Sequence, residues 1–239
     1  MKLTEQQRAH LKAIFDRGLV TGTGAYKHSP TCIEGAIALV VDGVISDQPS
    51  CVAPEDREWA IGINDARWSS KEDRAEALLP IALEQVGTRG TDRSKWVDDV
   101  IMNTMTQVIP MGLRQLGLRS EADMLENVKD IYHAREVVDA IKKSILKKKG
   151  PGSAVGYAIS SLKHCITSYT RDRVIPTYPK ICLNYITSSV HNLSNAVMVE
   201  TTPINRRLHN KESDKVLIAA IKVALDAYQK EQTTQSLPT

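Results

Sequence analysis

The residues whose types and spacing could do chemistry are concentrated between residues 22 and 74. Cys32 follows Thr31, which we expect to cap a helix, so its thiol would lie at the first helical position. A helix N-terminus can lower a thiol pKa, which is the environment of reactive cysteines. With His28 as a nearby base, Cys32 is a candidate nucleophile of a cysteine-dependent enzyme. The alternative is a capping box between Thr31 and Glu34, with Cys32 packed as a small apolar residue.

The loop before this helix, residues 21–30, has the composition of an anion-binding loop. Its amides, including those of Thr23 and Gly24, could line a pocket together with the N–H groups that open the next helix. The loop lacks the Gly-Lys-Ser/Thr ending of a P-loop, so the G-x-G pattern is a weak signal. An ordinary connection between two helices is the alternative.

A second polar set lies in the turn near residue 65 and in the helix that follows it. Arg67 and Arg74 could supply the positive charge that a phosphate needs. The same side chains could instead tie the turn to neighbouring helices through hydrogen bonds. We therefore predict a ligand site that draws on both regions, formed by Thr23, Gly24, Cys32, Glu34, Asn64, Asp65, Arg67 and Arg74.

Signatures of metal and cofactor chemistry are missing from the sequence. It contains no H-E-x-x-H motif, no zinc-deaminase signature and no EF-hand loop. It also lacks a nucleophile elbow and the protein-kinase motifs. We therefore expect neither a metal nor a cofactor.

The elements that must position these residues are helices. Apolar residues recur at helical spacing, and capping residues precede many of the runs. We expect Pro80 to kink or break its helix, and Pro110 and Gly112 to interrupt theirs. The expected helices cover about residues 4–17, 31–42, 54–66, 71–85, 95–116, 121–148 and 214–229.

These patterns predict a mainly α protein, a compact multi-helix domain. Residues 153–203 are ambiguous, because their β-branched and aromatic content suits a helix or one small β element. We expect an N-terminal helical unit over residues 1–89 and a C-terminal one over residues 90–239, which could together form one domain.

Composition excludes several classes of protein. The chain has 239 residues, of which 42% are hydrophobic and 25% charged, enough for a substantial core. No 18-residue apolar stretch or signal peptide is present, so we expect no membrane association. The four cysteines are scattered without a C-x-x-C pair, which favours reduced thiols in the cytoplasm.

Charge is distributed unevenly along the chain. The net charge is +3, and a cluster of lysines occupies residues 142–149. The cluster could contact phosphate or nucleic acid, but cations at the end of a helix also complement its dipole. We favour the second interpretation and do not expect a nucleic-acid partner, because the basic-plus-aromatic pattern of a dedicated module is missing.

Residues 24–87 resemble a pattern found in short hypothetical proteins of bacteria and their phages. The resemblance is carried by Thr31-Cys32-Ile33-Glu34 and by residues 47–52 and 63–70. It implies a phage or prophage protein in the host cytoplasm that counteracts host defence. We accordingly predict a non-catalytic protein that binds a host protein or a small anionic, nucleotide-like ligand. The alternatives are a cysteine-dependent enzyme using Cys32 and an oligomeric structural or assembly protein.

Overall fold

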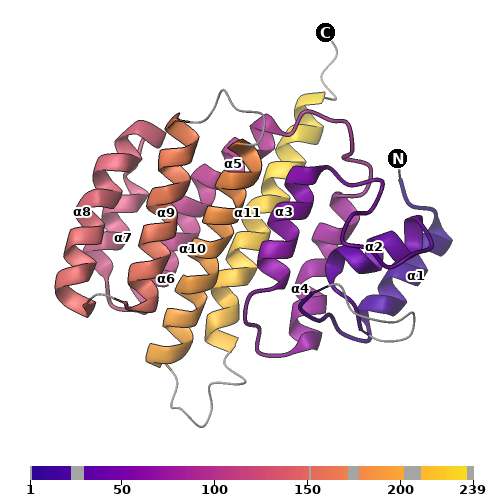
Figure 1. Ribbon diagram of the computed structural model, residues 1–239, viewed down its shortest axis with the longest axis horizontal. Coiled ribbons are helices and arrows are strands. Elements are labelled where there is room, and N and C mark those ends of the chain that lie inside the picture. The colour runs from indigo at the N-terminus through magenta and orange to yellow at the C-terminus, as the bar shows by residue number, and fades with distance from the viewer. Residues whose placement is uncertain (1, 23–29, 151, 172–177, 202–210, 236–239) are drawn as a thin grey trace.

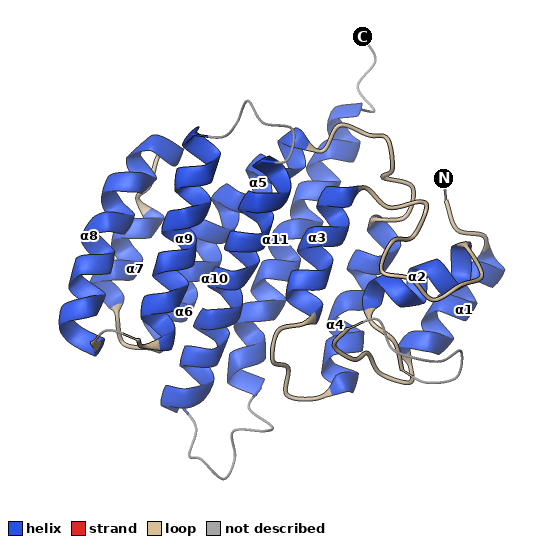
Figure 2. Ribbon diagram, in the orientation of Figure 1, coloured by secondary structure: helices blue, strands red, loops and turns tan. Residues whose placement is uncertain are grey.

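Helices are the regular secondary structure of the part of the chain that the structure describes. A computed structural model describes residues 2–22, 30–150, 152–171, 178–201 and 211–235, and these residues contain no strand (Figure 2). The protein is therefore mainly α, as the sequence predicts. Its elements are α1 (Glu5–Phe15), α2 (Ile33–Val41), α3 (Pro54–Asn64), α4 (Lys71–Glu84), α5 (Ser94–Asn103), the π-helix η1 (Thr104–Val108), α6 (Ile109–Gln115), α7 (Arg119–Glu126), α8 (Ile131–Lys149), α9 (Ala154–Arg171), α10 (Tyr178–Thr201) and α11 (Lys211–Gln235).

The long helix α10 lies at the centre of the bundle. It packs against α9 on one side and against α3 and α11 on the other, while α8 forms the edge beyond α9 (Figure 1). The shorter helices α1 and α2 lie at the opposite end, beside α4 (Figure 1). Helices from residues 1–89 and 90–239 thus contact one another directly, through α3 with α10 and α4 with α11.

The contact between α3 and α10 depends on a glycine. A Cβ atom built on Gly62 would lie 2.4 Å from the Thr187 hydroxyl oxygen, far inside van der Waals distance. Glycine therefore allows the two helix backbones to approach closely at this point.

Residues 154–171 and 178–201 form two helices, and the alternative of a small β element is not found in the described part of 153–203. Apolar residues of the ambiguous segment, including Cys182, Leu183, Ile186 and Val190, are buried in the central helix α10. Packing on several helices outweighs the modest strand preference of Ile, Val, Thr and Tyr.

Pro80 does not interrupt the helix in which it lies. α4 runs without a break from Lys71 to Glu84 through Pro80, so the expected break is wrong. Proline has no N–H, so the carbonyl of Glu76, four residues earlier, loses its helical hydrogen bond. Pro80 and Glu76 are both exposed, so water can donate a hydrogen bond to that carbonyl.

The run from α5 to α6 is likewise continuous, although Pro110 and Gly112 lie within it. The five-residue π-helix η1 directly precedes Pro110, and the N–H of Ile109 bonds to Thr104, five residues back. The wider turn accommodates a proline that has no N–H to donate.

The single helix expected over residues 121–148 is two helices, α7 and α8. Asp130 ends the continuity, because its Oδ1 accepts hydrogen bonds from the N–H groups of Tyr132 and His133 at 2.9 and 2.8 Å. These bonds cap α8 and compete with a helix running through this position.

Candidate functional site

Side chains of the protein already occupy N–H groups at the start of α2, the centre of the predicted site. Cys32 is the N-cap, and its Sγ accepts a hydrogen bond from the Gly35 N–H at 3.3 Å. The Ile33 N–H donates to Asn64 Oδ1 at 3.4 Å. Two amides that a bound anion would use are therefore engaged within the protein.

Asn64 and Asp65 hold the backbone that leads to this helix. The Asn64 amide donates to the Val20 carbonyl at 2.9 Å and to Asp65 Oδ1 at 2.8 Å. Asp65 Oδ1 in turn accepts from the Gly22 N–H at 3.2 Å. Asn64 and Asp65 thus tie the turn to the neighbouring backbone through hydrogen bonds, which was the alternative to a ligand-binding role. The loop residues Thr23, Gly24 and His28 lie outside the described residues.

The two arginines of the predicted site differ in exposure. Arg74 is buried, and its Nη1 donates to the Leu19 carbonyl at 3.0 Å and its Nη2 to the Ala66 carbonyl at 3.5 Å. Burial lowers the Arg74 pKa, while the charge of Asp65 opposes that shift. Arg67 is exposed to solvent. The structure therefore brings only Arg67 to the surface as an accessible cation of this set.

Glu34 lies in the first turn of α2 with its carboxyl group fully buried. The predicted capping box is wrong, because α2 begins at Ile33 and Cys32 is its N-cap. Neither Glu34 oxygen has a hydrogen-bond partner of good geometry among the described residues, and neither does the amide of Gln85, which lies close to it. Burial raises the Glu34 pKa to about 8, and Gln85 offsets only part of that rise. Glu34 is therefore largely protonated at neutral pH.

The four cysteines are buried, free thiols. Burial raises the pKa of Cys32, although the hydrogen bond from Gly35 acts in the opposite direction. Burial also raises the pKa of Cys51. A cysteine nucleophile needs the reverse, a lowered pKa and access to solvent. The environment of Cys32 thus suits its role as a helix cap.

A buried ion cluster around Arg93 is a feature that sequence reasoning missed. Its Nε and Nη2 donate to the two carboxylate oxygens of Asp56, each at 2.9 Å, and its Nη1 donates to Glu231. The Arg93 guanidinium lies 4.9 Å from the ring centres of both Trp96 and Tyr228, and the Tyr228 hydroxyl donates to Asp56. No local pattern could have revealed this cluster, because Asp56 and Tyr228, for example, are 172 residues apart in the sequence.

This cluster does not suit an anionic ligand. A cavity of about 450 Å³ lies beside Arg93, but Asp56 and Glu231 already place two carboxylates against one guanidinium. An added anion would have to displace one of them. We interpret the cluster as a structural tie that joins α3 and the start of α5 to α11.

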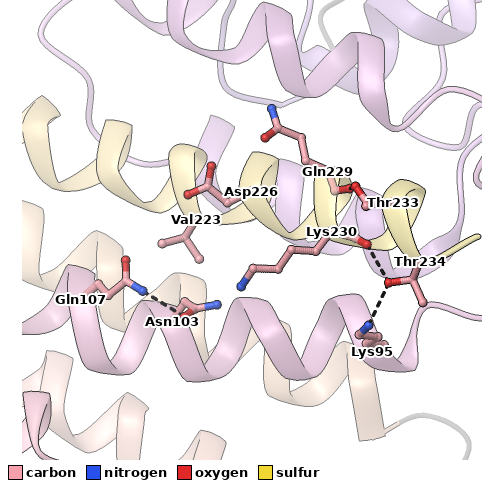
Figure 3. Close-up of a pocket in the computed structure, with 9 residues that line it drawn as sticks. All are labelled: Lys95, Asn103, Gln107, Val223, Asp226, Gln229, Lys230, Thr233 and Thr234. Carbon is pink, nitrogen blue, oxygen red and sulfur yellow. Dashed lines mark hydrogen bonds between the residues drawn. The ribbon is translucent and has the colours of Figure 1, made fainter. Parts of the chain in front are cut away.

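A groove between α5–η1 and α11 has more suitable chemistry. It encloses about 640 Å³, and eight of its nine lining residues have polar or charged side chains (Figure 3). Its lining residues are Lys95, Asn103, Gln107, Val223, Asp226, Gln229, Lys230, Thr233 and Thr234. None of them belongs to the predicted site.

Two lysines and one aspartate set the charge of this α5–α11 groove. Lys95 donates to the Thr234 hydroxyl at 3.4 Å from one side. The Lys230 side chain extends from α11 across the groove toward Asn103, and no described side chain pairs with its ammonium group (Figure 3). With Asp226 as the single acid, the lining side chains carry a net positive charge.

The π-helix shapes one wall of the groove. Asn103 directly precedes η1 and Gln107 lies within it, and the Gln107 amide donates to Asn103 Oδ1 at 2.9 Å. Short π-helical segments within α-helices are frequent at functional sites, because they shift the side chains that follow. Here the π-helix carries Gln107, and the residue directly before it, Asn103, supplies the second amide side chain of the wall.

A second groove, between α4 and α11, is mainly apolar. It encloses about 460 Å³ and is lined in part by Pro80, Ile218 and Leu225, and Ile218 is half exposed. Lys211 and Asp73 form an ion pair among its lining residues.

Comparison of the chain with protein-family models, with curated proteins and with solved structures gives no match. Among the described residues, no helix is long and apolar enough to cross a membrane. The same part of the chain contains no group of three or more His, Cys, Asp or Glu side chains that could hold a metal ion.

Proposed function

We propose that this chain is a non-catalytic protein that binds a small anionic ligand in the α5–α11 groove. The observation that carries the proposal is the ammonium group of Lys230, which extends into a polar groove without a partner among the described side chains. Lys95 adds a second positive charge on the opposite wall. A concave site with convergent cations and neutral hydrogen-bonding groups is suited to a small anion.

Charge distinguishes this groove from the other candidate anion sites. Arg93 is neutralised by two carboxylates, and Arg74 is buried against backbone carbonyls. At the start of α2, Cys32 and Asn64 engage two N–H groups. The α5–α11 groove needs no such contact to be broken before a ligand binds.

The non-catalytic part of the proposal is supported by the environment of Cys32. A buried thiol with a raised pKa that caps a helix lacks the features of a nucleophile. The roles in phage counter-defence, with a nucleotide-like signal or a host protein as partner, stay predictions that derive from the resemblance.

Isothermal titration calorimetry at low ionic strength tests the proposal. The probes are inorganic phosphate, AMP, a cyclic dinucleotide and ADP-ribose, because each carries phosphate. We expect at least one to bind and Lys230→Ala to weaken it about tenfold, the effect of losing one hydrogen bond to a charged group.

Lys147→Ala is the matched control, since Lys147 is an exposed lysine on α8, outside the groove. The affinity of Lys147→Ala for the bound probe should equal that of the wild-type protein. The proposal is refuted if no probe binds, or if the two lysine variants weaken binding equally.

A further inference from the structure

The α5–α11 groove has two chemically different ends. Lys95 and Thr234 meet at one end, and Gln107 lies near Val223 and Asp226 at the other (Figure 3). Along α11, Asp226, Lys230 and Thr234 follow at intervals of four residues, which is about 6 Å of helix rise per step. The backbone of Lys230 therefore lies about one helical turn from that of Asp226, and the Lys230 ammonium group lies between the two ends of the groove, beside Asn103 (Figure 3).

The part of the groove between Lys95 and the Lys230 ammonium group suits a phosphate group. Two ammonium groups on opposite walls can donate charge-assisted hydrogen bonds to different phosphate oxygens.

The end with Asp226 suits hydroxyl groups. A carboxylate accepts hydrogen bonds, and the Gln107 amide on the opposite wall can both donate and accept. Sugar and polyol hydroxyls match such a set, since each is both a donor and an acceptor. Asp226 would also repel a second phosphate, which disfavours dinucleotides and polyphosphates.

The α5–α11 groove offers few contacts to a nucleobase. The nine lining residues include no aromatic side chain, and Val223 is the single aliphatic residue among them. Proteins commonly hold bases by stacking on aromatic rings, each worth about 1–3 kcal/mol. The groove lacks that contribution from its described residues.

From these features we infer that the groove binds a phosphorylated sugar or polyol, with its phosphate between Lys95 and Lys230 and its hydroxyls at Asp226. The inference rests on the proposed function and narrows its ligand from nucleotide-like compounds to a sugar phosphate. The competing interpretation is that Asp226 and Lys230 form an ordinary i,i+4 ion pair on the surface of α11. In the structure Lys230 extends toward Asn103 instead, and the two charged groups are not paired (Figure 3).

Calorimetric titration with inorganic phosphate, ribose, ribose 5-phosphate and AMP tests the inference. We expect ribose 5-phosphate to bind at least tenfold more tightly than phosphate or ribose, because it engages both ends. AMP should bind no more tightly than ribose 5-phosphate.

The variant Asp226→Asn separates the two ends of the groove. It should weaken ribose 5-phosphate several-fold and leave phosphate binding unchanged or tighter, because a repulsive charge is gone. Lys230→Ala should weaken both probes, and Lys147→Ala should weaken neither. Circular dichroism of each variant checks that the helices are intact.

The other possible results show whether the sugar-phosphate inference alone fails or the proposed function fails as well. Equal affinity for phosphate and ribose 5-phosphate, or tenfold tighter binding of AMP, overturns the sugar-phosphate inference while the anion site stands. Equal strengthening of both probes by Asp226→Asn also overturns it, in favour of the ion pair. If phosphate, ribose 5-phosphate and AMP all fail to bind, the inference fails, and the proposed function fails with it if the cyclic dinucleotide and ADP-ribose do not bind either.

Discussion

Replacing Glu34 by glutamine should make the protein more stable at neutral pH. The Glu34 carboxyl group is completely buried in the first turn of α2, and its pKa is raised to about 8 chiefly by that burial. Glutamine has nearly the same shape but never has to take up a proton or bury a charge. The variant therefore removes the free-energy cost of protonating the Glu34 carboxylate, or of burying its charge, when the chain folds.

The size of the effect follows from the two pKa values. In the unfolded chain Glu34 has its ordinary pKa of 4.5, whereas in the folded protein it holds its proton up to about pH 8. A carboxyl with a raised folded pKa favours folding most at low pH, and its contribution falls as the pH rises from 4.5 to about 8. At about 1.4 kcal/mol per pH unit, the loss by pH 7 is about 3 kcal/mol.

Urea unfolding of the wild-type protein and Glu34→Gln at pH 5, 6, 7 and 8 measures this contribution. The difference in the free energy of unfolding should be small at pH 5 and favour the variant by about 2–3 kcal/mol at pH 7. Other groups titrate in both proteins, so their effects cancel in the difference. Glu136→Gln, at an exposed position of α8, is the control and should show no such trend. Parallel pH profiles for the wild-type protein and Glu34→Gln would refute the reasoning.

Two further outcomes are expected. Arg93→Ala should lower the free energy of unfolding by about 3–5 kcal/mol, because Asp56 would remain buried without its charged partner; a loss under 1 kcal/mol in urea unfolding would contradict a structural role for the cluster. Iodoacetamide at pH 7 should alkylate Cys32 slowly in the native protein and much faster in urea, because its thiol is buried with a raised pKa. Peptide mass spectrometry measures both rates, and fast native labelling would restore Cys32 as a candidate nucleophile.

The sequence by itself determined the helical class and several helix ends. Thr4 and Gln7 form the capping box that their spacing predicts, and Pro54 opens α3 as its position suggests. These features depend on residues within one turn of each other, and the same holds for the periodic apolar faces. Local interactions of this kind can be read from a single chain.

Predictions from local sequence spacing were wrong where a contact with a residue distant in the sequence competes with the local hydrogen bond. The spacing of Ser69 from Glu72 fits a capping box, but Ser70 caps α4, and the Ser69 hydroxyl and N–H donate to Asp214 on α11. Likewise, Asn64 bonds to the first N–H of α2 from the end of α3. A side chain bonds to whichever partner the fold brings near, and sequence spacing does not report that partner.

The candidate site was decided by tertiary structure alone. Lys95, Asn103 and Gln107 share one wall of the α5–α11 groove, and Asp226 and Lys230 share the other, more than 100 residues later in the chain. Each looks like an ordinary surface residue of a helix, and the sequence directed attention to residues 22–74 instead. Only the packing of α11 against α5 brings the two polar faces together, because a groove exists between helices and not within either one.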